Sequence, residues 1–184
     1  MGATADKLKA FEERKADLMT MGGEKMIEKQ HSQNKLTARE RIKYFFDEGS
    51  FQETQLFVKT RSTLFGLGDK EIKSDAVITG FGKVNGRTVF TAFQDFTSAG
   101  GSLGEMHAQK IWKVMDMAAD ARKPFISFND SGGARIQEGV LSLEGYGGIF
   151  YRNSITSGYI PQITAILPQT PIRPRPTWRW PRQW

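Results

Sequence analysis

The residues with the clearest chemical potential form a glycine-rich segment, Asn-Asp-Ser-Gly-Gly-Ala-Arg-Ile-Gln-Glu-Gly at residues 129–139. A glycine pair that directly follows a strand pattern and precedes a helix pattern leaves backbone N–H groups uncovered by side chains. Such groups bind a phosphate, or they stabilise the negative oxygen that develops during acyl chemistry. Glycine-rich strand ends also serve as plain structural turns. The spacing alone therefore leaves two interpretations open, a structural turn and an anion or oxyanion site.

A second glycine cluster, Phe-Thr-Ser-Ala-Gly-Gly-Ser at residues 96–102, also precedes a helix pattern. It is neither a G-x-G-x-x-G motif nor a P-loop, because no Lys-Ser or Lys-Thr pair follows its last glycine. Two interpretations again stay open, a helix-entry loop and a cradle for a cofactor phosphate. We favour the helix-entry loop.

Other side chains offer little catalytic chemistry. The chain of 184 residues has no cysteine, which excludes thiol catalysis, disulfides and cysteine-based zinc sites. The only histidines are His31 and His107, so a multi-histidine site is disfavoured and we expect no metal in this chain. No serine or cysteine nucleophile motif accompanies His107, and we interpret it as a structural residue rather than a general base. Asp95 and Asp130 are far apart in sequence and form no recognisable acid–base pair.

The positive charge of the chain is concentrated at its end. The formal net charge is +6, but residues 168–184 contain four arginines and no acid. This leaves 22 basic and 20 acidic residues, a net charge of +2, in residues 1–167. The same tail holds five of the seven prolines and three of the four tryptophans. We therefore expect a nearly neutral domain with no nucleic-acid partner, followed by a tail of foreign composition.

Helical patterns dominate the first part of the chain. Residues 5–30 are rich in Lys, Glu and Ala and predict a helix with a break around residues 22–23. Thr37 and Glu40 have the spacing of a capping box, in which each side chain satisfies a free backbone N–H at a helix start. The following helix can end at Gly49, in the left-handed region.

The pattern then changes to that of an α/β fold. Residues 76–81 and 87–93 predict two strands, joined by Asn-Gly at residues 85–86, a strong hairpin signal. A second capping box at residues 102–105 predicts a further helix. A strand at residues 124–128, a helix reaching about residue 157 and a last strand at residues 160–167 complete the pattern. This order predicts crossover connections and a parallel portion of the sheet.

Five segments together carry a more specific signal than any one motif. They are Leu-Thr-Ala-Arg-Glu-Arg-Ile at 36–42, Gly-Ser-Leu-Gly-Glu-Met-His-Ala at 101–108, the loop at 129–139, Gly-Tyr-Gly at 145–147, and residues 153–163. In this combination the chain resembles the β-type carboxyltransferase subunits of biotin-dependent acyl-CoA carboxylases. That family includes propionyl-CoA carboxylase, transcarboxylase and methylmalonyl-CoA decarboxylase, and the resemblance extends from about residue 5 to residue 167.

The resemblance implies an α/β, crotonase-like (ClpP/crotonase) carboxyltransferase fold, in which repeated ββα units pack helices around a sheet. It also implies an enzyme that transfers carboxyl between biotin and the α-carbon of an acyl-CoA such as propionyl-CoA or methylmalonyl-CoA. The implied partners are a biotin carboxyl carrier protein, which holds the biotin, and a biotin carboxylase or decarboxylase. A homo-oligomer is implied for the full-length subunit.

The same resemblance assigns a role to the first glycine loop. In this family, paired backbone N–H groups stabilise the negative oxygens of the thioester and of the biotin ring. By this match, the backbone N–H groups of Gly132, Gly133 and Ala134 are the expected oxyanion donors. The loop at Gly100 and Gly101 is expected to support the site without contacting the substrate, and no cofactor-binding side chain is identified.

The resemblance ends at Leu167, where the family continues with Gly-Pro-Cys-Ala-Gly-Gly-Ala-Val-Tyr-Ser-Pro-Ala. A small deletion with a change of reading frame is one hypothesis for the Arg/Pro/Trp tail that stands there instead. We expect an N-terminal helical segment at residues 1–35 and an incomplete, truncated N-terminal carboxyltransferase domain at residues 36–167. Residues 168–184 are then a non-family tail, predicted to be disordered.

Several functional hypotheses follow. The first is a fragment of an acyl-CoA carboxyltransferase that is inactive alone, with the acyl-CoA decarboxylase subunit of a biotin-dependent sodium pump as an alternative. Another is a non-catalytic truncated subunit that binds intact partners, and nucleic-acid binding through the basic tail is the least favoured. No apolar run reaches the roughly 18 residues of a membrane span and no secretory signal is visible, so we expect a cytoplasmic location.

Overall fold

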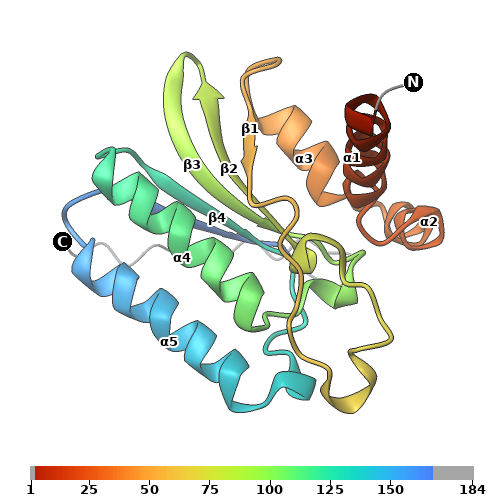
Figure 1. The fold of residues 1–184 in the computed structure, drawn as a ribbon. Helices are drawn as coiled ribbons and strands as arrows, with labels where there is room; N and C mark the ends of the chain where they lie inside the picture. Colours follow the sequence, from red (N-terminus) through yellow and green to blue (C-terminus); the bar gives the residue numbers. More distant parts are fainter. Residues whose placement is uncertain (1–2, 168–184) are drawn as a thin grey trace.

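A five-stranded mixed β-sheet organises the chain (Figure 1). The structure is a computed structural model that describes residues 3–167, and the tail predicted to be disordered lies outside this range. Neighbouring strands follow chain order, namely β1 Gln52–Thr54, β2 Val77–Val84, β3 Arg87–Gln94, β4 Phe125–Asn129 and β5 Gln162–Ile166. The β1–β2 and β2–β3 pairs are antiparallel, whereas β3–β4 and β4–β5 are parallel. The predicted α/β order is confirmed.

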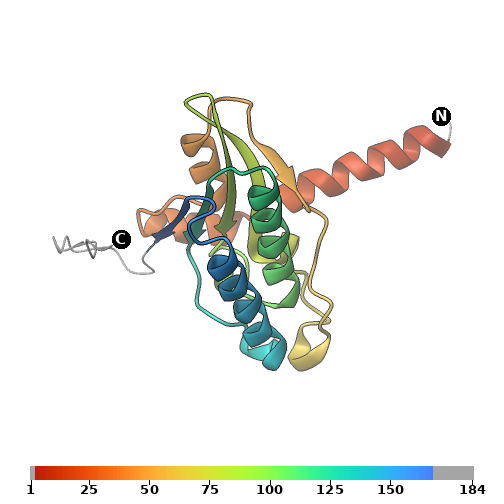
Figure 2. The same ribbon diagram turned by 90° about the vertical axis from the view of Figure 1, so that its left-hand side faces the viewer.

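Helices cover both faces of the sheet. Within residues 3–167 the α-helices are α1 Ala3–Met19, α2 Glu24–Ser32, α3 Ala38–Phe45, α4 Glu105–Asp120 and α5 Val140–Ile155. The break predicted around residues 22–23 is confirmed by the boundary between α1 and α2. α3 packs on one face of the sheet, α4 packs on the other with α5 beside it, and α1 extends away from the body (Figures 1 and 2). None of these helices has the length and apolar content that crossing a membrane requires.

Alternating side chains of the central strands build two separate apolar cores. Successive residues of a strand point to opposite faces of the sheet. Ile78 and Phe93 pack with Ile42 on the α3 side, whereas Val77 packs with Val114 on the α4 side. Each face of the sheet is therefore closed by a different helix, and the strands between them are buried on both sides.

Two local signals in the sequence are confirmed. Thr37 Oγ1 accepts a hydrogen bond from the Glu40 N–H at 3.3 Å, and the Glu40 carboxylate accepts one from the Thr37 N–H at 2.7 Å. Asn85 and Gly86 adopt φ values of 49° and 77° at the turn between β2 and β3. The Asp47 carboxylate accepts hydrogen bonds from both turn amides, at 2.9 and 2.8 Å. The hairpin is thus fixed by its own sequence and by one distant side chain.

The predicted end of the third helix is wrong. α3 ends at Phe45, and Phe46 takes an extended conformation with φ −95° and ψ 152°. Phe46 is buried in the core on the α3 side, which draws the backbone out of the helix before Gly49 is reached. Gly49 does adopt a positive φ of 68°, but it lies in the turn that follows. Tertiary packing, rather than glycine, therefore ends this helix.

Replacing Phe93 with alanine tests the core on the α3 side. Phe93 is 0% exposed and its ring stacks on Phe128 with centroids 4.1 Å apart. We expect Phe93→Ala to lower the free energy of unfolding by about 3–5 kcal/mol, because it removes the transfer energy and leaves a cavity. The control Tyr44→Ala removes a ring that is 90% exposed, and it should change stability by less than about 0.5 kcal/mol. Equal shifts in urea unfolding would contradict this assignment.

Candidate functional site at the carboxyl end of strand β4

The two glycine clusters follow two neighbouring strands and lie at the same edge of the sheet. The second cluster, residues 96–102, follows β3 and contains the 3₁₀ turn Ala99–Gly101, and the first, residues 129–139, follows β4 and contains the 3₁₀ turn Ile136–Glu138. Because β3 and β4 are parallel neighbours, their carboxyl ends lie side by side. The loops are joined directly, since the Gly132 N–H donates a hydrogen bond to the Gly100 carbonyl oxygen at 2.9 Å. The second cluster therefore supports the first, as expected.

Close approach of the loops requires glycine at one position. Gly101 has a φ of 62°, and a Cβ atom at this residue would collide with the Asp130 carbonyl oxygen. Gly100 has the same φ of 62°, but a Cβ atom there would have no neighbour within 4 Å. Gly100 is thus required only for its positive φ, whereas Gly101 is required both for its positive φ and because no space is left for a Cβ atom.

Two of the three predicted oxyanion donors are engaged inside the loop. The Gly132 N–H is bonded to Gly100, and the Gly133 N–H donates to Ser131 Oγ at 3.1 Å. No residue in the range 3–167 accepts a hydrogen bond from the Ala134 N–H. As the loop stands, Ala134 is therefore the donor best placed for an external oxygen, and the role of all three amides stays a prediction.

The orientation of the Ala134 amide follows from a short parallel bridge. The Leu103 N–H donates to the Gly133 carbonyl oxygen at 2.9 Å, and the Arg135 N–H donates to the Leu103 carbonyl oxygen at 2.8 Å. In such a bridge, the groups of the residue between the two bonded positions point to the opposite side. The Ala134 N–H consequently points away from Leu103, and its direction is set by the backbone on either side.

A cavity of about 670 Å³ lies beside this loop, between α5 and the adjoining faces of β4 and β5. Ser131 and Gly133 of the loop line it, together with polar side chains of β4 and apolar side chains of α5, including Ser127, Asn129, Tyr146, Ile149 and Phe150. The Ser127 hydroxyl donates to Asn129 Oδ1. Burial raises the pKa of the Tyr146 phenol, which keeps this group neutral. The cavity thus combines an apolar wall with a polar end next to the glycine loop.

The buried side chain of Arg135 links the loop at residues 129–139 to the protein interior. Its side chain is 2% exposed, and its guanidinium bonds to Asp75 Oδ1 at 2.5 Å and Glu138 Oε1 at 2.8 Å. The same group donates to the Ser102 carbonyl oxygen at 2.8 Å. A buried charge is stable only with this degree of pairing. Because Arg135 follows Ala134 directly, the network anchors the backbone of the candidate donor.

The prediction of a second capping box at residues 102–105 is wrong, because Glu138 supplies the side chain that caps α4. The residue at the N-cap position of α4 is Gly104, which makes no side-chain cap hydrogen bond. Glu138 accepts the Glu105 N–H at 2.6 Å and places a carboxylate at the helix N-terminus, where the backbone dipole favours it. Burial raises the pKa of Glu138, but hydrogen bonds from the Glu105 amide and Arg135 outweigh this effect and lower its pKa overall. The N-terminus of α4 is therefore capped by Glu138, near the end of the loop at residues 129–139.

The partner of Arg135 sits in a strained turn. Residues 74–76, none of them glycine, adopt positive φ values of 49°, 47° and 61°. Each such residue costs about 1–2 kcal/mol, so neighbouring contacts must hold the turn. The His107 N–H donates to Asp75 Oδ2 at 2.7 Å, and Lys110 Nζ donates to the Ser74 and Val77 carbonyl oxygens at 2.8 and 2.5 Å. Buried groups of α4 thus stabilise the turn.

His107 and Lys110 are both removed from solvent. His107 is 0% exposed, and its ring nitrogens lie 2.8 Å from the Asp75 carbonyl oxygen and 3.2 Å from Gln94 Nε2. The prediction of a structural His107 is confirmed, and burial keeps the ring neutral by lowering its pKa well below the usual value. Burial also lowers the pKa of Lys110 to about 7. Asp75 and Lys110 carried no sequence signal, because each is defined only by contacts with distant residues.

Asp95 and Asp130, which are far apart in sequence, each follow one of two parallel neighbouring strands, β3 and β4. Asp130 is buried and paired with Arg41 at 2.7 Å, whereas Asp95 accepts the Thr97 N–H at 2.8 Å. Burial raises the pKa of Asp95. Asp95 thus has a local partner and Asp130 a distant one, and neither carboxylate lines the cavity beside the glycine loop.

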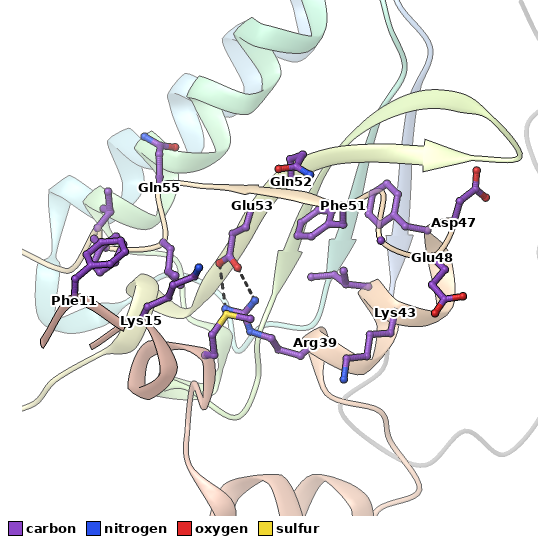
Figure 3. Close-up of a pocket in the computed structure, with 17 residues that line it drawn as sticks. Phe11, Lys15, Arg39, Lys43, Asp47, Glu48, Phe51, Gln52, Glu53 and Gln55 are labelled. Atoms are coloured by element: carbon purple, nitrogen blue, oxygen red, sulfur yellow. Dashed lines mark hydrogen bonds and ion pairs between the residues drawn. The ribbon is translucent and has the colours of Figure 1, made fainter. Parts of the chain in front are cut away.

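A different cavity, of about 1220 Å³, lies between α1, α3 and β1 (Figure 3). An ion pair between Arg39 and Glu53 spans it, with nitrogen–oxygen distances of 2.5 and 3.1 Å. Its walls include apolar side chains such as Phe11 and Phe51. No residue of either glycine cluster lines this cavity, whereas Ser131 and Gly133 line the one of about 670 Å³. Within residues 3–167, no group of three or more His, Asp or Glu side chains could hold a metal ion.

The mixed sheet with helices on both faces makes this an α/β protein, and the comparisons with known proteins place it in the carboxyltransferase class. A sequence model of the Carboxyl transferase domain matches residues 29–171, and the chain belongs to this family. The family predicted from the five sequence segments is therefore confirmed, and with it the crotonase-like class of the fold.

Individual relatives agree with this assignment. The chain is 54% identical over 167 residues to the methylmalonyl-CoA decarboxylase subunit alpha of Propionigenium modestum, covering 91% of this chain and 32% of that protein. It is 54% identical over 162 residues to the propionyl-CoA carboxylase beta chain of Cereibacter sphaeroides, covering 88% and 32%. The crystal structure of transcarboxylase 12S superposes with a TM-score of 0.87 at 44% identity, covering 90% and 32%. The chain thus spans about a third of the length of these relatives.

Alanine at the two loop glycines separates conformational strain from collision. We expect Gly100→Ala to cost about 1 kcal/mol, because only its positive φ opposes a side chain. Gly101→Ala should cost at least about 3 kcal/mol, because the added Cβ also displaces the Asp130 backbone. Urea unfolding of both variants measures the difference. Equal costs would show that the two loops do not approach as closely as described.

The depressed pKa of Lys110 predicts a rise of stability with pH. The pKa of this ammonium is about 7 in the folded chain against 10.5 for an ordinary lysine, so the unfolded chain binds more protons between these values. The free energy of unfolding should therefore increase between pH 7 and pH 10, by roughly 3 kcal/mol. Lys110→Met should lose this increase. The control Lys113→Met, which changes an exposed lysine of the same helix, should keep it.

Proposed function

We propose that this chain forms part of an acyl-CoA carboxyltransferase site, which moves carboxyl between biotin and the α-carbon of an acyl-CoA such as propionyl-CoA or methylmalonyl-CoA. The observation that carries the proposal is the Ala134 N–H, held at the carboxyl end of β4 without a partner in residues 3–167. Membership of the carboxyl transferase domain family supports it. So does the similarity of the chain to a methylmalonyl-CoA decarboxylase subunit and to propionyl-CoA carboxylase beta chains.

The proposed work of the loop is electrostatic. Biotin, brought by a carrier partner, supplies or accepts the carboxyl group. The Ala134 N–H donates to the substrate oxygen on which negative charge develops, and Gly132 and Gly133 keep side chains out of its path. Because the network around Arg135 fixes the backbone in advance, little reorganisation is needed when the charge appears. This arrangement favours a transition state with an oxyanion over the neutral thioester.

The cavity next to the loop is the proposed site for the acyl group. Tyr146, Ile149 and Phe150 offer an apolar wall, while Ser127 and Asn129 offer polar atoms near the glycine loop. A short apolar acyl chain with one carbonyl oxygen matches this division. The proposed partners are a biotin carboxyl carrier protein and a biotin carboxylase or decarboxylase, in a homo-oligomer when the subunit has its full length. The cytoplasm is the proposed location.

Two alternatives stand beside this proposal. One is an acyl-CoA decarboxylase subunit of a biotin-dependent sodium pump, since the chain is as similar to a methylmalonyl-CoA decarboxylase subunit as to a propionyl-CoA carboxylase beta chain, at 54% identity each. The second is a non-catalytic subunit that binds intact partners. Co-purification with an intact subunit, without turnover by the chain itself, would distinguish this second alternative from an active enzyme.

A chimera tests the contribution of the loop to catalysis. Residues 36–167 would replace the matching segment of transcarboxylase 12S, and carboxyl transfer to propionyl-CoA would be measured. We expect the chimera to be active and Ala134→Pro to lower kcat by about 10²–10³, because proline removes the donor N–H. Ala134→Ser keeps this N–H and should stay within about fivefold of the chimera.

The outcomes separate the parts of the proposal. A folded chimera without activity would contradict the carboxyltransferase function of this segment. An active chimera in which Ala134→Pro is as fast as Ala134→Ser would contradict the role of this amide alone. For the 184-residue chain by itself we expect little or no turnover of carboxybiotin with propionyl-CoA, and clear turnover would refute that expectation.

A further inference from the structure

A cavity of about 890 Å³ lies at the end of the sheet where β3, β4 and β5 begin. Its walls come from the hairpin between β2 and β3, the loop between α4 and β4, and Pro161 before β5 (Figure 1). The two glycine loops follow the carboxyl ends of β3 and β4, so these strands separate them from the cavity. The five residues of β4 alone span about 17 Å. This cavity is therefore distinct from the one beside the glycine loop.

The charged side chains that line this cavity are all basic. They are Arg87 at the start of β3, and Arg122 and Lys123 in the loop after α4. All three are exposed, and none forms an ion pair with another residue in the range 3–167. Arg122 Nε donates to the Tyr159 hydroxyl at 2.9 Å, but no described residue accepts from its terminal nitrogens. The cavity thus combines three positive charges with no acid in its walls.

Capping of α4 does not explain these side chains. Basic residues near a helix end often satisfy its last carbonyl groups. Here, backbone N–H groups of residues 121–123 already donate to the carbonyl oxygens of residues 117–119. Arg87 lies on a strand and has no helix end to cap. The three basic side chains are therefore available to an anion.

Backbone acceptors at this end of the sheet are engaged. The Pro124 carbonyl oxygen accepts the Phe90 N–H at 2.9 Å. The Pro161 carbonyl oxygen accepts the Phe125 N–H at 3.0 Å. The two proline rings and Val84 add apolar surface to the walls. An anion in the cavity would therefore meet basic and apolar groups, and these two carbonyl groups would not oppose it.

We propose that this cavity binds an anion that contains a pyrophosphate group. A terminal phosphate carries about −1.5 to −2 charges at pH 7, so a pyrophosphate group brings on the order of three negative charges to three basic side chains. Two of these side chains are arginines, whose planar guanidinium groups bind phosphate oxygens in pairs. Inorganic pyrophosphate and a nucleoside diphosphate both carry this group, and the cavity has room for either. The site lies across the sheet from the glycine loops, so the inference goes beyond the proposed function.

Isothermal titration calorimetry of the 184-residue chain with sodium pyrophosphate, without divalent metal ions, tests the proposal. At about 0.15 M salt we expect saturable binding of one anion per chain, with a dissociation constant below about 1 mM. Arg87→Gln and Arg122→Gln should each raise this constant at least about tenfold, because each removes charge-assisted hydrogen bonds. Both side chains are exposed, and circular dichroism of each variant verifies its fold.

The tail supplies a matched control, because residues 168–184 contain four further arginines. Arg175→Gln and Arg179→Gln make the same change of net charge and should alter the dissociation constant by less than about twofold. Lys25→Gln, at an exposed position of α2, is a second control with the same expectation. Pyrophosphate should also raise the unfolding temperature of the parent chain and of these controls more than that of Arg87→Gln.

Titration with ADP distinguishes the two sources of the pyrophosphate group. An affinity for ADP at least about tenfold above that for pyrophosphate would identify a nucleotide, whose base contacts the apolar wall. Equal affinities would identify the pyrophosphate group alone as the recognised part. Either result supports the proposal.

Three results would overturn the proposal. The first is an absence of saturable binding up to about 10 mM pyrophosphate. The second is an equal effect of the cavity and tail variants, which would attribute binding to the overall charge of the chain. The third is tighter binding of a hexaglutamate peptide than of pyrophosphate and ADP, which would identify an acidic protein segment instead. The measurement requires no carboxyltransferase activity, so its result is independent of the proposed function.

Discussion

The geometry of the glycine loop depends on the buried ion pair between Arg135 and Asp75. Two charges in a protein interior lose hydration energy, and they persist only when hydrogen bonds satisfy their remaining atoms. Arg135 also bonds Glu138 and Ser102, and Asp75 also accepts the His107 amide. Even so, the pKa of Asp75 is raised overall, because burial and the nearby Glu138 carboxylate oppose the lowering effect of Arg135. The members of this network therefore depend on one another, because removing one leaves another charged or polar group unpaired.

Three distant segments meet at this network. The strained turn at residues 74–76 leads into β2, α4 begins at Glu105, and the glycine loop leads into α5. Lys110 and His107 of α4 hold the turn, while Glu138 beyond the loop caps α4. Strain in the turn is thus offset by buried hydrogen bonds that also orient the loop. The site is rigid because the same side chains satisfy the backbone of several elements.

The sheet that positions the glycine loop also forms one wall of the cavity beside it. This cavity is lined by Phe150 of α5 and Ile166 of β5, and both are largely exposed. Among residues 3–167, β4 is the neighbour of β5 in the sheet, so residues of an edge strand of the described sheet border the candidate cavity.

Local features of this protein are determined by the sequence alone. The Asn85–Gly86 turn, the capping box of Thr37 and Glu40, and the break between α1 and α2 each depend on residues within about four positions of one another. The glycine loops and the family were visible in the same way, because their residue strings are contiguous. Such signals need no distant partner to be interpreted.

The tertiary structure decided the features that depend on long-range contacts. Packing of Phe46 ends α3 early, and Glu138 rather than a local side chain caps α4. The parallel pairing of β3 and β4 brings the two glycine loops together, so that the Gly132 N–H donates a hydrogen bond to the Gly100 carbonyl oxygen. Which of the three loop amides stays available is therefore set by hydrogen bonds between neighbouring strands and loops. No local sequence pattern encodes those bonds, because their donors and acceptors are the same backbone groups in every residue.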